Sequence, residues 1–297
     1  MKKEYRISFI KLKPLWFNLG ALRKIRELKT AILIPAFLFV MIAPSSSYSQ
    51  PLELLYKNLD NATSLDVTPN AIYIVEQGRN RLLQLDHSGE LLESMGGRGS
   101  GDYQFSRPID VDATNGLKVY VSDYNNRRVK VLGRRGEFLS QITALKHFGR
   151  QRNISPTQIS VDELGQVIFY DESTNSIQRI NEEADLIDEF RLDNEILRVD
   201  DMILVGQLLF ILDSEAELIH VLSENGNYEL FYPAKDVFAF HTDGETIWKS
   251  FASRLVIENR NSEDRIIEFG ERIPVVDIDV MDGTMYVLGD QALYKIQ

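Results

Sequence analysis

The chain has 297 residues, with 33 Lys and Arg against 44 Asp and Glu, four His and no Cys. Without cysteine, disulfides, thiolate nucleophiles and zinc–thiolate sites are excluded. Residues 1–49 hold nine basic and two acidic residues, so the remaining 248 residues carry a net charge of −18. Phosphate backbones repel a body of this charge, which argues against nucleic-acid binding.

The N-terminal segment has the order of a secretory signal. Nine basic residues precede the apolar run 31–44, and small polar residues follow it. We therefore predict a signal peptide over 1–49 that is cleaved before Gln50, and a periplasmic or extracellular protein. The apolar run has 14 residues. A bilayer span needs about 20, so an uncleaved membrane anchor is the weaker alternative.

From residue 50 onward, short apolar or alternating runs are separated by Gly, Asn, Asp and Ser, which is typical of β-strands. One type of strand recurs six times, at intervals of 37 to 48 residues: 71–76, 118–123, 166–171, 207–213, 245–250 and 284–289. Six copies of about forty residues predict one all-β domain over 50–297. The domain is expected to be a six-bladed β-propeller with four antiparallel strands in each blade.

The internal register of the repeats supports this prediction. The anchor residues of the recurring strands are Tyr73, Tyr120, Ile168, Phe210, Ile247 and Tyr286. Nine residues after each of the first five anchors lies a Leu or β-branched residue, and sixteen residues after each lies a polar turn. In three of these turns the residue is Gly89, Gly136 or Gly226, where a tight hairpin requires positive φ.

The sixth repeat is incomplete, because the chain ends before its last strand. Residues 51–59 read as a strand that belongs to no full repeat. An unpaired sheet edge is an aggregation hazard that ring closure removes. We therefore predict that residues 52–58 form the outer strand of the last blade.

Residues 96–132 resemble the NHL repeat of six-bladed propellers. The matching positions are Gly97, Gly99, Gly101, Phe105, Pro108, Tyr120, Asp123, Asn126, Arg128 and Val129. Repeats one and three match in part, and repeats four to six keep only spacing and hydrophobicity. The resemblance implies a ligand or partner surface on one face, usually without catalysis. We interpret Asp123, Asn126 and Arg128 as structural, because a carboxylate paired with an Arg five residues later can tie a strand end to its loop.

Ligand-binding residues are expected where the inner strands meet the channel. We align these strands on Asp66, Asp110, Ser160, Asp201, Ala239 and Asp277. Three positions earlier lie Thr63, Arg107, Thr157, Arg198, Asp236 and Pro274. Two Arg in such a funnel can hold a carboxylate or phosphate bidentately. The alternative is that they pair with neighbouring acids, such as Asp110, Asp200 or Asp201. Tyr124 and Asn125, after the second anchor strand, are expected on the same face.

We therefore expect an exported, monomeric, non-catalytic propeller that binds a protein, peptide or glycan in the cell envelope, with no cofactor and no metal ligands to name. The alternative is a calcium-dependent hydrolase similar to gluconolactonase-type propellers. Carboxylates converging on the axis would favour the enzyme, since Ca²⁺ prefers oxygen ligands. Arg107 and Arg198 lining the channel would disfavour calcium.

Overall fold

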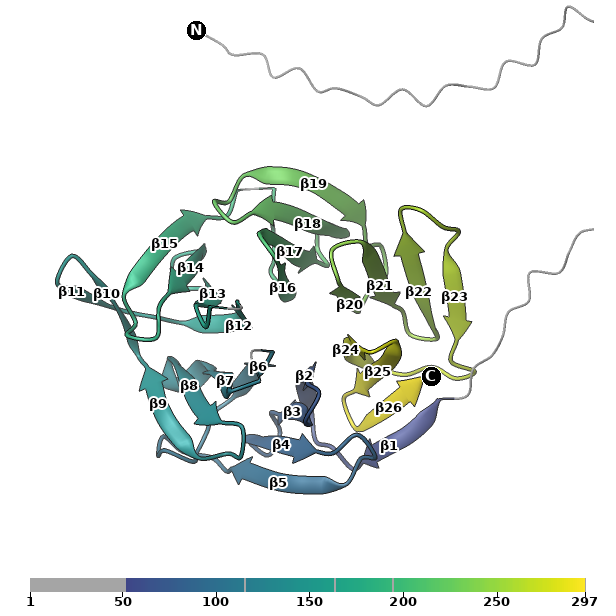
Figure 1. Cartoon of the computed structure of the whole chain (residues 1–297), viewed down its shortest axis with the longest axis horizontal. Helices are drawn as coiled ribbons and strands as arrows, with labels where there is room; N and C mark the ends of the chain where they lie inside the picture. Colours follow the sequence, from purple (N-terminus) through teal and green to yellow (C-terminus); the bar gives the residue numbers. More distant parts are fainter. Residues whose placement is uncertain (1–51, 115, 163, 194, 297) are drawn as a thin grey trace, which may run out of the picture. The chain divides into compact units, whose positions relative to one another are not determined.

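The computed structural model describes residues 52–296 except 115, 163 and 194. Six sheets of four antiparallel strands stand around a central axis, and each sheet is one blade of a β-propeller (Figure 1). The predicted fold class is therefore confirmed. The predicted signal peptide over 1–49 and its cleavage before Gln50 lie outside the described residues. Within the described residues, no helix is long and apolar enough to cross a membrane.

The first three blades follow one another along the chain, each from its inner to its outer strand. Blade 1 contains β2 (Ala62–Val67), β3 (Ile72–Glu76), β4 (Arg81–Leu85) and β5 (Leu91–Gly96). Blade 2 contains β6 (Pro108–Asp112), β7 (Lys118–Asp123), β8 (Arg128–Gly133) and β9 (Phe138–Ile142), with the 3-10 turn η2 (Tyr124–Asn126) between β7 and β8. An extra hairpin, β10 (Ala144–His147) and β11 (Arg150–Asn153), precedes blade 3, which contains β12 (Pro156–Val161), β13 (Val167–Asp171), β14 (Ser176–Ile180) and β15 (Leu186–Arg191).

The last three blades complete the ring. Blade 4 contains β16 (Asp201–Val205), β17 (Leu208–Asp213), β18 (Leu218–Ser223) and β19 (Tyr228–Pro233). Blade 5 contains β20 (Ala239–Thr242), β21 (Thr246–Ser250), β22 (Arg254–Asn259) and β23 (Arg265–Glu268). Blade 6 contains β24 (Val275–Met281), β25 (Thr284–Gly289), β26 (Ala292–Ile296) and, as its outer strand, β1 (Glu53–Lys57).

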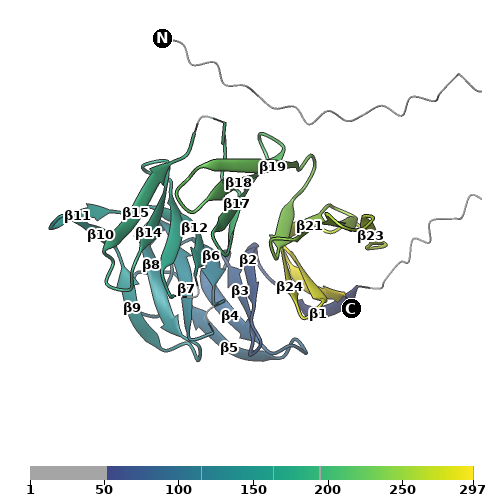
Figure 2. The ribbon, with the colours of Figure 1, turned by 45° about the horizontal axis from the view of Figure 1, so that its top comes forward.

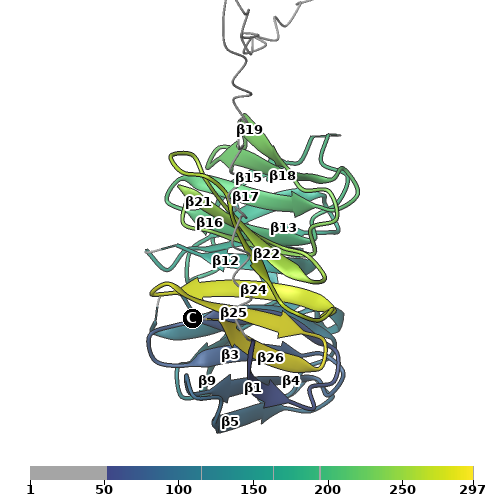
Figure 3. The same cartoon turned by 90° about the vertical axis from the view of Figure 1, so that its right-hand side faces the viewer.

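Closure of the ring joins the two ends of the described chain. The strand β1 pairs antiparallel with β26, from Glu53 opposite Lys295 to Lys57 opposite Ala292. Figure 3 shows this blade from the rim, with β1 beside the C-terminal strands. The prediction that residues 52–58 complete the last blade is confirmed, since without β1 the strand β26 would have an unpaired edge.

The hydrophobic core lies between the blades. Side chains of a strand alternate between its two faces, so each blade contributes apolar residues to both neighbours. Six buried clusters result, one at each junction between adjacent blades. Tyr73, for example, packs against blade 2, whereas Ile74 packs against blade 6.

The predicted register holds in four blades and slips in the fifth. The loop between the second and third strands has four residues in blades 1 to 4 but three, Phe251–Ser253, in blade 5. Trp248, and not the predicted anchor Ile247, takes the position that the anchors occupy in the other blades, and Leu255 and Ile257 join the same cluster in place of Val256. The turn glycines are as predicted, with φ of 87° at Gly89, 85° at Gly136 and 76° at Gly226.

Candidate functional site

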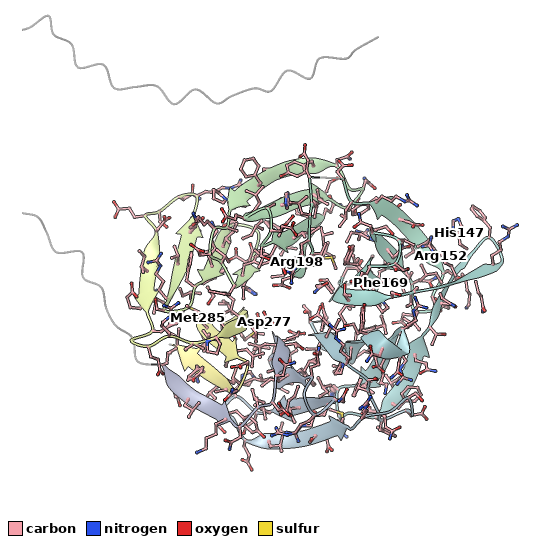
Figure 4. All side chains as sticks on the ribbon, turned by 180° about the vertical axis from the view of Figure 1, so that it is seen from behind. His147, Arg152, Phe169, Arg198, Asp277 and Met285 are labelled. Carbon is pink, nitrogen blue, oxygen red and sulfur yellow. The ribbon has the colours of Figure 1, made fainter. Side chains whose placement is uncertain are left out.

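A cavity of about 250 Å³ opens where the inner strands of all six blades meet, and we call it the axial cavity. Six aspartates and one histidine line it: Asp66, Asp110, Asp112, Asp201, Asp277, Asp279 and His241. Figure 4 shows Asp277 at the edge of the central opening. Carboxyl groups from four blades therefore line one small space, although Asp66 and Asp279 are 213 positions apart in the chain.

The strand geometry places these residues in two rings. In each blade, one residue of the inner strand pairs with the anchor residue of the second strand (with Trp248 as the anchor of blade 5). These six inner-strand residues form the first axial ring: Asp66, Asp112, Ser160, Ile203, His241 and Asp279. Two residues earlier on the same face lies the second axial ring, Ser64, Asp110, Gln158, Asp201, Ala239 and Asp277. The alignment predicted from the sequence mixed the two rings: it set Asp66 and Ser160 of the first ring beside Asp110, Asp201, Ala239 and Asp277 of the second.

The axial carboxylates also join neighbouring blades. Asp277 Oδ2 accepts a hydrogen bond from the Leu65 N–H at 2.7 Å, and Asp279 Oδ2 accepts one from Val67 at 2.6 Å. The same contact recurs from Asp66 to the Ala113 N–H. It recurs again from Asp110 to Ile159 at 2.7 Å and from Asp112 to Val161 at 2.8 Å. Blades 6, 1, 2 and 3 are thereby linked in sequence, so these aspartates stabilise the ring as well as lining the cavity.

Two carboxylate oxygens have no such protein partner. Asp201 accepts the N–H of Met202 at 2.7 Å through Oδ1, and Asp66 accepts the Ala113 N–H through Oδ2. Within the described residues, Asp201 Oδ2 and Asp66 Oδ1 accept no hydrogen bond. These two oxygens are therefore the carboxylate atoms left to contact a ligand or a water molecule.

Burial and mutual repulsion perturb the acidity of the cavity. Burial raises the pKa of Asp110 to about 7, with further contributions from the Asp201 and Asp112 charges, whereas hydrogen bonds from Ser64 and Ile159 oppose the rise. Burial likewise raises the pKa of Asp112 and of Asp201 to about 6. The pKa values of Asp66 and Asp277 are also raised well above their usual value, again first by burial and then by neighbouring carboxylates. Protonated and ionised carboxyl groups therefore coexist in the cavity near neutral pH.

A calcium ion, the cofactor of the alternative function, can be tested against these residues. No three His, Asp or Glu side chains in the described part of the chain are grouped so that they would hold a metal ion. Most of the axial carboxylates already accept backbone N–H groups of the next blade. The residues present therefore do not form a ready calcium site, and we derive no chemical step through a metal.

The predicted ring of ligand-binding residues lies apart from the cavity lining. Arg198 pairs with Asp200 at 2.6 Å, and its side chain is 63% exposed near the central opening (Figure 4). Arg107 is exposed, has φ of 55° and stacks over Tyr124 at 4.9 Å. Thr157 is buried, and the Thr63 hydroxyl donates to the Ile109 carbonyl at 2.7 Å. None of these, nor Asp236 or Pro274, lines the axial cavity. The roles assigned to them stay predictions.

The two predicted face residues lie together at a second cavity. Tyr124 and Asn125 line an open space of about 410 Å³ with Arg127, Ser155, Glu172 and Ser173, from the loops of blades 2 and 3. The Tyr124 hydroxyl donates to Glu172 at 2.6 Å, and Asn125 donates to Ser106 at 3.2 Å. We call this space the face cavity.

The three residues interpreted as structural are in contact. Asp123 is fully buried and pairs with Arg128 at 2.8 Å, and Asn126 donates to the same carboxylate oxygen at 2.7 Å. Arg128 also donates to the carbonyls of Ser100 and Gln104, both at 2.9 Å, in the loop that leads into β6. Such a network fixes the loop geometry of blade 2.

The sequence analysis did not predict the axial aspartates as site residues. Their spacing could have indicated the site, since Asp110 and Asp112, like Asp277 and Asp279, are carboxylates two positions apart on one strand. That spacing places both side chains on one face, here the face toward the axis.

Comparison with known proteins shows which architecture is shared. No protein-family model matches the chain, and no curated protein does. The NHL resemblance therefore stays a prediction. Among solved structures, a gluconolactonase of Xanthomonas campestris is similar with a TM-score of 0.57 and 12% identity, covering 82% of this chain and 88% of that one.

Two further solved structures agree. Virginiamycin B lyase of Staphylococcus aureus has a TM-score of 0.53 and 14% identity, covering 80% of each chain. A Bacteroides fragilis protein described as a candidate exported protein has a TM-score of 0.54 and 10% identity, covering 83% of this chain and 94% of that one. At this identity the likeness shows the fold alone, and the protein is a six-bladed β-propeller.

Proposed function

We propose that the protein is a hydrolase that opens small lactones or related esters in the axial cavity. The observation that carries this proposal is the convergence of six aspartates, three with pKa values of about 6 to 7, on one cavity of about 250 Å³. Titratable groups with strongly perturbed pKa values in a concave site are candidates for acid–base chemistry. Carboxylates lining the axis are also the feature that favours the enzyme over the binding module.

The cavity can supply both an acid and a base. Burial raises the pKa of Asp66 well above its usual value and so favours its protonated form, which through Oδ1, an atom that accepts no hydrogen bond from a described residue, can give a proton to the leaving alkoxide of an opened ring. Asp201 is mostly ionised at that pH, and its Oδ2 faces the cavity without a hydrogen bond from a described residue. In this mechanism Asp201 takes the proton of the attacking water.

The solved neighbours add general support. Proteins named as a gluconolactonase and as a virginiamycin B lyase have this fold, so six-bladed propellers do act as enzymes. At 12–14% identity this likeness carries no substrate over to the present chain.

The test is hydrolysis of a panel of aldonolactones and simple esters by the full chain, followed by pH-stat, with EDTA and separately with millimolar Ca²⁺. We expect turnover that falls by about 10²-fold or more in Asp201→Asn, since general-base catalysis contributes about 10²–10⁴-fold. The exposed Asp102→Asn is the matched control and should leave the rate unchanged. No turnover by the wild type under either condition would refute the proposal, and turnover only with Ca²⁺ would restore the calcium-dependent alternative.

The face cavity supports a second candidate, a non-catalytic propeller that binds a protein, peptide or glycan. Its walls combine an aromatic ring, Tyr124, with amide, guanidinium, hydroxyl and carboxylate groups from two blades. Aromatic residues supply contact area with few rotamers, and polar groups around them give specificity. A Tyr124→Ala variant that keeps its fold but loses a partner captured from envelope extracts would support this function, whereas equal capture by both forms would exclude this surface.

Location in the cell envelope or outside the cell is part of the proposal. It depends on the predicted signal over 1–49 and is supported by one solved neighbour described as a candidate exported protein. Expression of the full chain in a bacterium, followed by fractionation and N-terminal sequencing, tests export and cleavage before Gln50. A full-length chain in the cytoplasmic fraction would contradict both.

A further inference from the structure

The β10–β11 hairpin lies outside the four-stranded pattern of the blades, although Leu145 of β10 packs in the core between blades 2 and 3. It lies between the outer strand of blade 2 and the inner strand of blade 3, and it is the only two-stranded sheet among the described residues. Figures 1 and 2 show it projecting outward beyond β15. Insertions on a rigid scaffold commonly carry binding residues.

The tip of the hairpin displays an aromatic side chain in a strained backbone. Phe148 is 93% exposed, and its ring lies edge-on to that of His147 at 4.2 Å. Its φ of 46° is in the left-handed region, which a bulky L-residue adopts rarely and at a cost in free energy. Asn or Gly would relieve this strain, and a polar side chain would remove the exposed apolar surface. Folding alone therefore does not account for a phenylalanine here.

The base of the hairpin holds the tip in a fixed direction. Arg152 donates to Glu189 at 3.0 Å and to Gln178 at 2.7 Å, both in blade 3. The Lys146 N–H donates to the Ala184 carbonyl at 2.8 Å, and its Nζ donates to the Glu183 carbonyl at 2.7 Å. Exposed Lys146 and Arg150 flank the tip. The result is a rigid, basic projection with an apolar end, on a protein that is otherwise acidic.

An apolar groove with an acidic rim lies between blades 5 and 6. Its volume is about 330 Å³, and Trp248, Ile257, Val280 and Met285 form its apolar lining. The inter-blade spaces found between blades 1 and 2 and between blades 3 and 4 are about 10 Å³ each, so this junction is much more open than those two. Glu263 and Arg265 belong to the lining, and further exposed charged residues adjoin lining residues along the chain: Glu245 beside Thr246, Asp264 beside Glu263, Asp282 beside Gly283, and Arg260 beside Asn259. We call the four acids of this set the acidic rim.

The hairpin and the groove complement each other but lie far apart on one molecule. Figure 4 shows His147, at the tip, and Met285, in the groove, on opposite sides of the ring. We propose that the β10–β11 hairpin of one copy docks in the groove between blades 5 and 6 of a second copy, with Phe148 against Trp248 and Met285 and with Arg150 facing the acidic rim. The contact is head-to-tail and heterologous. It departs from the monomer expected from the sequence.

Charge favours this occupant over an anionic membrane. The body around the hairpin carries most of the net charge of −18 and would be repelled by anionic lipid, and the tip offers only one apolar ring for insertion. Two copies also repel at long range. At physiological ionic strength that repulsion is screened beyond about 8 Å. The attraction between the basic tip and the acidic rim acts at shorter distances and is screened less. We therefore expect association that is weakest at low salt.

The chain contains no cysteine, so pairs of introduced cysteines report the contact directly. His147→Cys keeps Phe148 in place, and Ser262→Cys lies on the wall of the groove. The two single-cysteine full chains are mixed under mild oxidation, and the mixed disulfide is quantified. Leu164→Cys, 80% exposed on another loop, replaces His147→Cys as the collision control. Truncating a central aromatic anchor commonly costs about fivefold or more in affinity, so Phe148→Ala on the His147→Cys chain should lower the yield about fivefold.

The proposal requires that His147→Cys with Ser262→Cys give a mixed disulfide well above the Leu164→Cys control, and that Phe148→Ala remove the excess. Equal yields in all three pairs would overturn it. So would an unchanged yield in the Phe148→Ala chain, because the contact would then not depend on the apolar tip. A fluorophore on His147→Cys that responds to phosphatidylglycerol vesicles, with no excess cross-linking, would assign the hairpin to a membrane instead.

Discussion

Replacing Asp110 by Asn should change the sign of its effect on stability between acid and alkaline pH. In the folded protein burial raises the pKa of Asp110 from 3.8 to about 7. One pKa unit corresponds to about 1.4 kcal/mol, so the ionised carboxylate destabilises the fold by about 4 kcal/mol above pH 7. Three donors, Ser64 Oγ and the Val111 and Ile159 N–H groups, bind the two oxygens of Asp110, whereas Asn has one acceptor oxygen, and losing one hydrogen bond costs about 1 kcal/mol.

The folded state holds its proton up to a higher pH than the unfolded state does. Between pH 3.8 and about 7 the unfolded chain therefore binds fewer protons at this site, and stability falls as pH rises. Asp110→Asn removes this loss. We expect the variant to be more stable than the wild type by about 3 kcal/mol at pH 8.5 and less stable by about 1 kcal/mol at about pH 3, below the unfolded-state pKa. For a domain of this size the gain at pH 8.5 raises Tm by about 6–12 °C.

Thermal and urea unfolding in EDTA at both pH values measures this difference, with Asp102→Asn as the exposed control. Equal destabilisation by Asp110→Asn at about pH 3 and at pH 8.5 would refute the reasoning, because ionisation of the buried carboxyl would then not cost stability. Repeating the series with millimolar Ca²⁺ adds a second measurement. A cation that binds the folded cavity would stabilise the wild type and flatten its pH dependence.

Three further predictions follow from other parts of the fold. Arg128→Ala should lower the free energy of unfolding in urea by about 3–5 kcal/mol, because it leaves the fully buried Asp123 carboxylate without its cation. The control Arg198→Ala, which breaks an exposed surface pair, should lower it by under about 1 kcal/mol. Equal losses in the two variants would contradict this reasoning. Deleting residues 52–58 should lower Tm sharply and cause aggregation, since β26 loses its partner; an unchanged melting curve would disprove the role of β1 in closure. Replacing Arg107 and Arg198 together by Ala should leave the kcat/KM of lactone hydrolysis within about twofold of the wild type, because neither residue lines the axial cavity. A large loss would place the site at the ring of ligand-binding residues predicted from the sequence.

Much of the fold could be predicted because its rules are local. A strand and its turn of constant length recur along the chain, and Gly89, Gly136 and Gly226 mark the hairpins by the backbone conformation that they permit. The incomplete last repeat and the spare strand at 52–58 predict closure, since a propeller cannot leave an edge unpaired. The slip in blade 5 arises where this regularity fails, since Trp248 and not Ile247 packs at the junction with blade 6.

The axial cavity could not be predicted in the same way. The sequence shows that Asp66, Asp110 and Asp277 are on inner strands, but their mutual distance depends on closure of the ring over more than two hundred residues. Their pKa values depend on burial and on each other's charge, which are properties of the assembled cavity. The sequence by itself therefore determined the repeating strands, the number of blades and the closing strand, since these follow from local spacing. Only the tertiary structure decided which carboxylates meet, because non-local packing brings distant side chains into one low-dielectric space.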